Sequence, residues 1–245
     1  MVLATATDPE IAGAGQDGGL ASALLIYALE TGVIDAALLS AAGPGLEPRA
    51  LVARSRAEVL AAAGSRYTFS PHLLAWHEAE AGRLGLAGVG CQVAVPAVAA
   101  ARGARRLAGR VALTVGLLCN RTFTDDLFTD LLAPRHGLPR ESITRLNIKG
   151  RLQVWAGAPL TAAPDAEVPL KECDPFARPG CRHCPDFTAA QADISLGGIG
   201  RFARTTLAIV RSDRGAALLD AMARDGWVTM RDAAEDDPDA VALVA

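Results

Sequence analysis

The chain has 245 residues, of which 51% are hydrophobic, and its formal net charge is −3 with a pI near 5.8. This length and composition are sufficient for the core of one large domain or two small ones. Lys and Arg are not concentrated in any segment, which excludes a basic nucleic-acid-binding surface. The longest apolar runs, 20–29 and 111–118, are far shorter than the roughly 20 residues of a membrane-spanning helix, and so we expect no span.

The amino terminus has no basic segment followed by an apolar stretch, as a secretory signal would have. We therefore expect a cytoplasmic protein. Five cysteines are too few and too unevenly spaced for a secreted disulfide framework. Metal binding, redox chemistry and simple burial remain as interpretations of these cysteines.

The first half of the chain alternates predicted helices and strands. Gly18 and Gly19 precede the apolar run LASALLIYALE, which predicts a buried helix over 20–31. Ser55, three residues before Glu58, forms a capping-box pattern that predicts a helix ending near Gly64. Further elements are predicted as a strand over 35–41, a helix starting at 71, a strand over 86–89, a helix over 92–102, a strand over 110–118 and a helix over 125–132. This alternation predicts an α/β fold, with a mixed or partly parallel sheet flanked by helices.

From Asn147 the pattern changes. The run IKGRLQVW predicts a hairpin strand, a Pro-rich and Ala-rich connector follows at 158–169, and the last elements are a strand over 205–210 and a helix over 215–223. We therefore expect an α/β core at 1–157, and a C-terminal α+β portion at 158–232 with a cysteine-containing loop and a glycine-rich loop. Residues 233–245 are expected to form a disordered acidic tail.

Cys181 and Cys184 form a CxxC hairpin, whose spacing lets two thiolates face one metal. A zinc knuckle, a dithiol redox pair and half of an iron-sulfur site all have this spacing. The chain offers no second CxxC or spaced His pair for zinc, and Pro179-Gly180 and Pro185 indicate a loop rather than the strand and helix of a thioredoxin-like pair.

Cys91 and Cys119 each follow a predicted strand. Adjacent parallel strands would bring these two cysteines together, where α/β folds build sites, and with Cys181 and Cys184 they would complete a shell of four thiolates. The alternative is that Cys91 and Cys119 are ordinary buried cysteines. Cys173 could replace one of the four or remain a free thiol nearby.

Two glycine-rich segments are candidates for cofactor contacts. The residues from Gly13 to Gly18 match GxGxxG, but Asp8-Pro9-Glu10 before them is a poor strand, so the match supports only an anion site made by Gly18 and Gly19 at a helix amino terminus. The second segment, DISLGGIG at 193–200, would let a backbone approach a flat ring or a phosphate closely, or would make a tight turn.

Taken in chain order, the motifs GQDGGLASALLIYALETGVIDAAL, GSRYTFS, VGCQ, GLLC, IKG and CRHCPDFTAAQADISLGGIG resemble the beta-subunit family of coenzyme F420 hydrogenases and dehydrogenases, which is related to formate dehydrogenase beta subunits and to reductases of chlorophyll-type pigments. The resemblance implies an oxidoreductase with FAD and a 4Fe-4S cluster. Such a protein passes electrons between a two-electron carrier, often coenzyme F420, and one-electron iron-sulfur carriers.

The resemblance also implies site residues. The cluster ligands would be Cys91, Cys119, Cys181 and Cys184, and the flavin would bind mainly to the core at 1–157. The residues in segments that would line the flavin are Gly18, Gly19, Ser22, Ser65, Tyr67, Lys149, Asp193, Ser195 and Gly197.

Three departures from the family pattern bear on these expectations. Many relatives carry an amino-terminal ferredoxin-like module, which is absent here, so a separate ferredoxin-like or other redox partner is expected alongside a small-molecule hydride donor or acceptor, in a homo- or hetero-oligomer. Gly90 precedes Cys91 where a proline is common, and His72 stands where an asparagine is expected. Two alternatives remain open, namely a non-catalytic electron-transfer subunit and a zinc-stabilised binding module.

Overall fold

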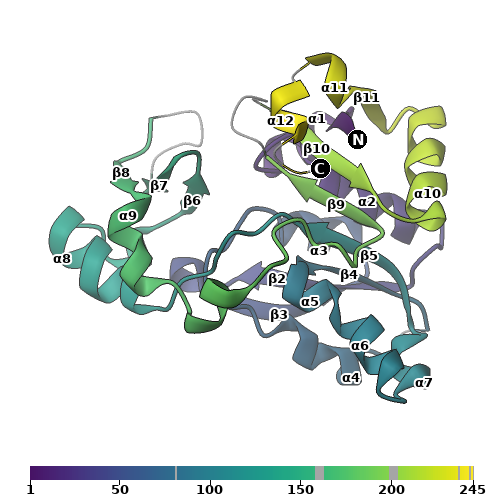
Figure 1. Cartoon of the computed structure of the whole chain (residues 1–245), viewed down its shortest axis with the longest axis horizontal. Helices are drawn as coiled ribbons and strands as arrows, with labels where there is room; N and C mark the ends of the chain where they lie inside the picture. The colour runs from purple at the N-terminus through teal and green to yellow at the C-terminus, as the bar shows by residue number, and fades with distance from the viewer. Residues whose placement is uncertain (81, 158–162, 199–203, 237, 243, 245) are drawn as a thin grey trace.

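The structure is a computed structural model that describes residues 1–80, 82–157, 163–198, 204–236, 238–242 and 244. In these residues the chain forms two β-sheets, one of eight strands and one of three, which stand apart in Figure 1 with the small sheet on the left. Within the same residues, no helix combines the length and apolar character that crossing a membrane requires.

The large sheet has the strand order β11-β1-β10-β9-β5-β4-β2-β3. Its strands are β1 (Val2–Ala6), β2 (Ala36–Ala42), β3 (Pro48–Ala53), β4 (Leu84–Val89), β5 (Val111–Leu117), β9 (Ile194–Gly197), β10 (Thr206–Val210) and β11 (Val228–Asp232). The four central strands β9, β5, β4 and β2 run parallel, and the outer strands pair antiparallel. This mixed sheet confirms the predicted α/β fold.

Helices cover both faces of the large sheet. The α-helices are α1 (Pro9–Ala14), α2 (Leu20–Glu30), α3 (Arg56–Ala61), α4 (Ala75–Glu78), α5 (Gly90–Val93), α6 (Val95–Ala101), α7 (Arg105–Ala108), α8 (Ala133–His136), α9 (Leu170–Cys173), α10 (Asp213–Arg224), α11 (Ala233–Asp236) and α12 (Pro238–Ala242). Shorter or wider helical turns are η1 (Pro44–Leu46), η2 (His72–Leu74), the π-helix η3 (Leu127–Leu132), η4 (Arg140–Ser142), η5 (Asp174–Phe176) and η6 (Pro179–His183).

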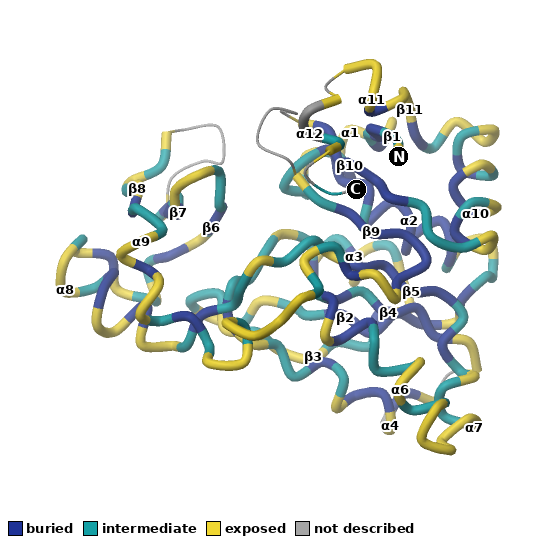
Figure 2. Tube along the Cα trace, in the orientation of Figure 1, coloured by how far each residue is buried: buried dark blue, intermediate teal, exposed yellow. Residues whose placement is uncertain are grey.

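Because side chains alternate between the two sides of a strand, each face of the large sheet has its own hydrophobic core. In β2, Ala37 and Leu39 join the core with α2, α3 and α10, whereas Ala36 and Leu38 face the core that contains Trp76 of α4. The α2 helix is buried almost all round, as its apolar run predicts. Figure 2 shows the resulting buried centre of the large sheet and the exposed α7 at its margin.

The small sheet has the order β6-β7-β8, with β6 (Arg145–Ile148), β7 (Arg151–Trp155) and β8 (Ala166–Pro169) all antiparallel. Lys149 and Gly150 form the hairpin turn that the run IKGRLQVW predicts, and Gly150 has the positive φ of 72° that such a turn favours. β8 lies in the predicted connector and pairs with β7. The expected boundary between 157 and 158 therefore cuts across this sheet.

The end of the chain also differs from expectation. Residues 233–236 and 238–242 form α11 and α12 where the acidic composition favours disorder. The apolar residues Val241 and Val244 pack against a buried group that contains Leu3 and Ile209. Burial of these few side chains accounts for the order, because they cover apolar surface of β1 and β10.

Candidate functional site

Cys91 and Cys119 lie at the carboxyl ends of neighbouring strands. β4 and β5 pair in parallel from Leu84 to Val89, as the sequence pattern predicts. Cys91 follows β4 in the first turn of α5, and Cys119 stands two residues after β5. Because both strands end at the same edge of the sheet, the two thiols share one region of the molecule.

Backbone hydrogen bonds join the segment after β5 to the CxxC loop. The Cys119 amide donates to the carbonyl of Phe187 at 2.9 Å, and the Arg178 amide donates to the carbonyl of Thr122 at 3.0 Å. The Thr122 amide and hydroxyl both lie 3.5 Å from the sulfur of Cys181. These contacts bring Cys119 beside the two cysteines of the loop.

The four thiols Cys91, Cys119, Cys181 and Cys184 are free, and the other three act electrostatically on Cys119. Burial raises the pKa of Cys119 to about 12, and the thiols of Cys181, Cys91 and Cys184 add to the rise. Burial also raises the pKa of Cys91, again with contributions from Cys184 and Cys181. Cys91 and Cys184 are exposed. Among the described residues, no three His, Cys, Asp or Glu side chains are close enough together to hold one metal ion.

Cys173 is separate from this group. It is fully buried in the core of the small sheet, and its sulfur lies 3.7 Å from the carbonyl oxygen of Pro169. Burial raises its pKa to about 11, with further contributions from the carboxylates of Glu172 and Asp174. The structure therefore brings together the four cysteines expected from the resemblance and leaves the fifth outside.

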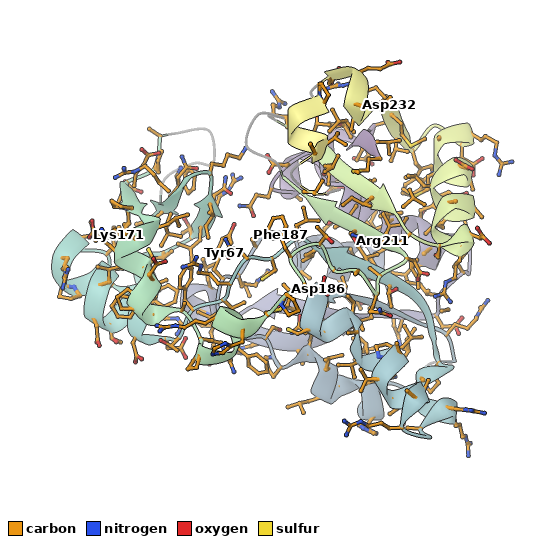
Figure 3. All side chains as sticks on the ribbon, viewed as in Figure 1. Tyr67, Lys171, Asp186, Phe187, Arg211 and Asp232 are labelled. Atoms are coloured by element: carbon orange, nitrogen blue, oxygen red, sulfur yellow. The ribbon has the colours of Figure 1, made fainter. Side chains whose placement is uncertain are left out.

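Gly90 makes room for Asp186 beside the cysteines. A Cβ at position 90 would overlap the Asp186 carboxylate, whose other oxygen accepts a hydrogen bond from the Ala190 amide at 2.9 Å. A proline here would also collide with this carboxylate. Figure 3 shows Asp186 and Phe187 near the middle of the molecule, with Tyr67 on the side toward the small sheet. Gly90 thus permits a close approach of the Cys91 turn and the segment that holds Asp186.

Gly90→Ala is expected to displace Asp186 and to lower stability by about 1–3 kcal/mol, the usual cost of forcing an atom into a packed site. Urea unfolding followed by circular dichroism measures this cost. Gly180→Ala is the matched control, because no atom lies within 4 Å of the Cβ it would add in the neighbouring loop. Equal stability of the two variants would contradict the steric explanation.

Lys149 and Tyr67, two of the predicted flavin residues, lie where the small sheet contacts the segment before α2. This region, which also contains Gln16, Asp17 and Asn147, is termed the sheet junction. The Lys149 ammonium pairs with Asp17 at 2.9 Å, and the Tyr67 hydroxyl accepts a hydrogen bond from the Ile148 amide at 3.2 Å. Gln16 donates to the Asn147 side-chain oxygen at 2.5 Å. Burial raises the pKa of Tyr67, so this hydroxyl stays protonated.

Gly18 and Gly19 lie beside the sheet junction at the amino terminus of α2. Their φ angles are 73° and 71°, and a Cβ on Gly19 would overlap the Ile11 backbone of α1. β1 leads into α1 and not directly into these glycines, so the segment lacks the strand-to-glycine turn of a dinucleotide fold. What remains is a buried helix amino terminus that no side chain caps, next to Asp17 and the Lys149 ammonium that pairs with it.

Ser22 and Ser65 lie near the same elements. Ser22 is buried in the first turn of α2, and the Ser65 hydroxyl interacts with Tyr67. Gln16, Asp17 and Asn147 complete the sheet junction, and the sequence patterns did not identify them. Gln16 and Asp17 lie inside the GxGxxG match, in which only the glycines carry a recognisable signal.

Asp193 and Ser195 serve the fold with their side chains. Asp193 accepts hydrogen bonds from the Thr114 amide at 2.7 Å, the Ser212 hydroxyl at 2.6 Å and the Arg214 guanidinium at 2.8 Å. Ser195 is fully buried, and its hydroxyl donates to the Ala189 carbonyl at 3.0 Å. These two side chains are thus engaged with protein groups, whatever their backbone contacts.

Gly197 and Gly198 connect the sheet junction to the cysteines. A Cβ on Gly197 would lie 2.6 Å from the Leu118 side chain, and one on Gly198 would overlap the Asp17 carboxylate. Leu118 immediately precedes Cys119. The start of the glycine-rich loop therefore spans from Asp17 to the cysteine group, whereas positions 199 and 200 of this motif lie outside the described residues.

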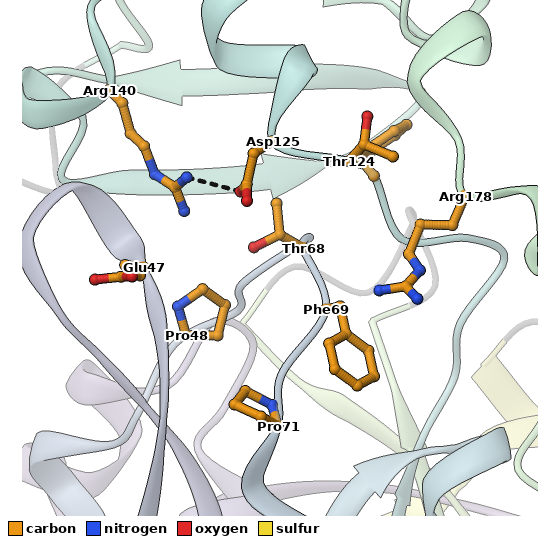
Figure 4. Close-up of a pocket in the computed structure, with 10 residues that line it drawn as sticks. Glu47, Pro48, Thr68, Phe69, Pro71, Thr124, Asp125, Arg140 and Arg178 are labelled. Carbon is orange, nitrogen blue, oxygen red and sulfur yellow. Dashed lines mark hydrogen bonds and ion pairs between the residues drawn. The ribbon is translucent and has the colours of Figure 1, made fainter.

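A hollow of about 370 Å³ opens next to the cysteine loops, and Figure 4 shows the residues that line it. The Arg178 guanidinium lies 4.4 Å from the centre of the Phe69 ring, and Arg140 pairs with Asp125 at 2.7 Å. Phe69 is 55% exposed. None of the predicted flavin or cluster residues lines this hollow.

His72 lies beside Gly88 of β4 and is buried, with 1% of its surface exposed. Its Nδ1 atom lies 2.9 Å from the Ser70 hydroxyl. Burial lowers the pKa of His72 to about 4, which means that the imidazole is neutral above that pH.

Acid is therefore expected to destabilise the protein through His72. In the unfolded chain, His72 binds a proton below its ordinary pKa of 6.5. In the folded chain, it binds this proton only when the pH falls to about 4. The contribution of neutral His72 is complete above pH 6.5, and about 2–3 kcal/mol of it is lost by pH 4.5. Urea unfolding at both pH values measures this loss. A loss equally large in His72→Asn would contradict its assignment to His72.

The fold and site define an α/β protein in which strand ends and a CxxC loop bring four free cysteines together. Residues 1–76 match the family described as coenzyme F420 hydrogenase/dehydrogenase, beta subunit N-term, and residues 81–236 match the family that describes the C terminus of the same beta subunit. The chain therefore belongs to the coenzyme F420 hydrogenase/dehydrogenase beta-subunit family.

Two similar proteins are coenzyme F420 hydrogenase beta subunits. The one from Methanothermobacter thermautotrophicus is 34% identical over 229 residues, 89% of this chain and 79% of that protein. The one from Methanosarcina barkeri is 32% identical over 247 residues, 97% of this chain and 83% of that protein. A chain of the F420-reducing NiFe hydrogenase complex of Methanosarcina barkeri superposes with a TM-score of 0.87 at 32% identity, covering 94% of this chain and 81% of that one. The chain is thus a redox subunit related to those of F420 hydrogenases.

Proposed function

We propose that this protein is an iron-sulfur flavoprotein oxidoreductase that passes electrons between coenzyme F420 and one-electron iron-sulfur carriers. The observation that carries the proposal is the position of the segment 118–124. It holds Cys119, bonds to the CxxC loop, and donates from the Phe123 amide to the Tyr67 carbonyl at 2.7 Å. One segment therefore joins the four-cysteine group to the sheet junction.

The cysteine group suits a 4Fe-4S cluster held by Cys91, Cys119, Cys181 and Cys184. A cluster attaches each thiolate to a different iron, so its ligands need not stand within the roughly 4 Å that tetrahedral zinc imposes. The amide and hydroxyl of Thr122 face the Cys181 sulfur, where they would tune the potential by hydrogen bonding. The raised thiol pKa values mean that cluster binding would release protons.

The sheet junction suits FAD. Gly18 and Gly19 are buried at the start of α2, where no side chain caps the helix and where the helix dipole favours a phosphate. Lys149 would add a positive charge and Tyr67 a protonated hydroxyl, while Gly197 lets the backbone approach closely. A bound flavin supplies the exchange between two-electron and one-electron chemistry. Ser22 and Ser65 would flank this site, and the hydrogen bonds of Asp193 and Ser195 would hold in place the strand β9, which ends at Gly197.

Side chains of this protein would control proton supply and access of water during the proposed reaction. Oxidation of one molecule of reduced F420 releases two electrons and two protons, and a cluster held by the four cysteines would accept the electrons one at a time. The neutral Tyr67 hydroxyl and the Lys149 ammonium hold protons at the sheet junction. The partial burial of Cys119 would limit access of water to its sulfur.

A separate iron-sulfur protein is the proposed electron partner. Cys91 and Cys184 are exposed, and Arg182 and His183 lie between the two loop cysteines. Phe69 and Arg178 add an exposed aromatic ring and a positive charge close by. Such a face favours a partner with acidic groups around its own redox centre. The structural relative that belongs to a hydrogenase complex supports a hetero-oligomer.

The test is anaerobic purification of the full chain, followed by analysis of iron, acid-labile sulfide and flavin. We expect a brown protein with one cluster and one FAD, and oxidation of reduced F420 coupled to a one-electron dye. A cluster without flavin would instead support the non-catalytic electron-transfer subunit. Zinc without iron or sulfide would contradict the proposal and favour a zinc-stabilised module.

A further inference from the structure

The turn that carries Cys91 is held by the residue that follows it. The side-chain oxygen of Gln92 accepts a hydrogen bond from the Val89 amide at 3.1 Å, which satisfies the free donor at the start of α5. The side-chain nitrogen of Gln92 donates to the Ser70 carbonyl at 3.1 Å. Gln92 is only 8% exposed, so both hydrogen bonds are shielded from water.

The surroundings of Gln92 are built for this contact. A Cβ on Gly88 would lie 2.8 Å from the Gln92 side-chain oxygen and 3.3 Å from His72 Nε2, so a larger residue in β4 would push both side chains away. His72 holds the hydroxyl of Ser70, whose carbonyl is the acceptor for Gln92. A buried polar group that is satisfied on both sides fixes one arrangement of the segments it joins.

Ser70 belongs to the same segment as Tyr67, whose hydroxyl lies in the sheet junction. Tyr67, three residues earlier, bonds to the Ile148 amide through its hydroxyl and to the Phe123 amide through its carbonyl. Gln92 therefore lies between the cysteine turn and the segment that reaches the small sheet. Figure 1 places α5, which carries Gln92, directly at the end of β4.

We propose that Gln92 is a positioning residue that locks the Cys91 turn onto the Tyr67 segment and, resting on the proposed function, fixes the cluster relative to the flavin site. Gln92 touches neither a substrate nor a cofactor in this role. It acts through the backbone of Val89 and Ser70. The cluster environment changes when this link is cut, even if all four cysteines remain.

The test compares Gln92→Leu and Gln92→Glu in the full chain by amide hydrogen exchange with the cluster removed by a chelator. Leucine removes both hydrogen bonds at similar volume, whereas an ionised glutamate keeps the acceptor for Val89 and loses the donor to Ser70. In Gln92→Leu, exchange over 86–91 and 67–72 is expected to rise about fivefold, since a hydrogen bond contributes about 1 kcal/mol. In Gln92→Glu the rise is confined to 67–72.

The second readout is the electron paramagnetic resonance spectrum and the midpoint potential of the cluster-loaded variants. Both are expected to change in Gln92→Leu while the iron content is retained. Gln153→Leu is the matched control, because Gln153 makes its 2.7 Å hydrogen bond to Glu167 on the solvent-exposed side of the small sheet. It should alter neither readout.

Unchanged exchange in both Gln92 variants would overturn the inference, and so would faster exchange with an unaltered spectrum and potential. If Gln92→Leu does not fold, the near-isosteric Gln92→Glu decides. A wild-type protein without iron overturns the proposed function before any variant is made. The exchange measurement then still decides whether Gln92 joins the two segments.

Discussion

Cys119→Ser is expected to lose the iron-sulfur cluster while the protein stays folded. A serine hydroxyl does not replace a thiolate as an iron ligand. Burial, together with the three neighbouring thiols, raises the pKa of Cys119 to about 12. Iron and acid-labile sulfide should fall by about tenfold or more, since even indirect changes at metal sites reduce affinity by 10–100-fold. The broad visible absorption of the anaerobic protein should fall in parallel.

Cys173→Ser is the control for this loss. Cys173 is fully buried in the small sheet, and serine can keep the hydrogen bond to the Pro169 carbonyl. We expect a stability cost of about 1 kcal/mol and an unchanged iron content. The assignment of the four ligands would be contradicted if Cys173→Ser lost the cluster and Cys119→Ser kept it.

Asp193→Ala is expected to be the most destabilising of these substitutions, at about 3–4 kcal/mol. It leaves the Thr114 amide and the Ser212 hydroxyl without an acceptor and Arg214 without its partner. Urea unfolding measures the loss. Asp193→Asn keeps the shape and should cost less, and Asp220→Ala, on the exposed side of α10, should change stability by under about 0.5 kcal/mol.

The charge of Asp193 also sets the pH range of its contribution. Burial acts to raise the pKa of Asp193, but hydrogen bonds from Ser212, Thr114 and Arg214 outweigh burial and lower it. The folded pKa is thus below the unfolded value, so the stabilisation is complete above the ordinary pKa of aspartate and is lost as the pH falls through the folded value. Stability of Asp193→Ala that matched wild type at neutral pH would refute this account.

Local patterns in the sequence predicted the parallel centre of the fold. The apolar run before Gly32 and the two runs that end near Cys91 and Cys119 carry enough periodicity to identify α2, β4 and β5. β1 was missed because its five residues are short and its partners, β10 and β11, lie some two hundred positions later. No local signal encodes such a pairing.

The candidate site was predictable only in part. Cysteine is rare enough in this chain that Cys181 and Cys184 point to a metal or redox site by type and spacing. Gln92 and Asp186 have no such signal, since amides and carboxylates are common on surfaces. Their roles arise from partners that only the tertiary structure supplies, at Ser70 and Gly90.

Asp193 illustrates a different limit. The resemblance places it in a segment that would line the flavin, which stays a prediction, while its side chain joins β5, β9 and the start of α10. A carboxylate with this many donors has no capacity left for a ligand. The sequence pattern marks this position, but the hydrogen-bond partners of its side chain come from distant segments that only the tertiary structure brings together.

The position of β1 between β10 and β11 has a consequence for biosynthesis. The first strand leaves the ribosome with no partner, because both neighbours are encoded near the end of the chain. β9, which follows the CxxC loop, must also be made before it can pair with β5. The large sheet can therefore be completed only after residues 194–232 have been synthesised, so β1 and β5 wait for these partners while the polypeptide grows.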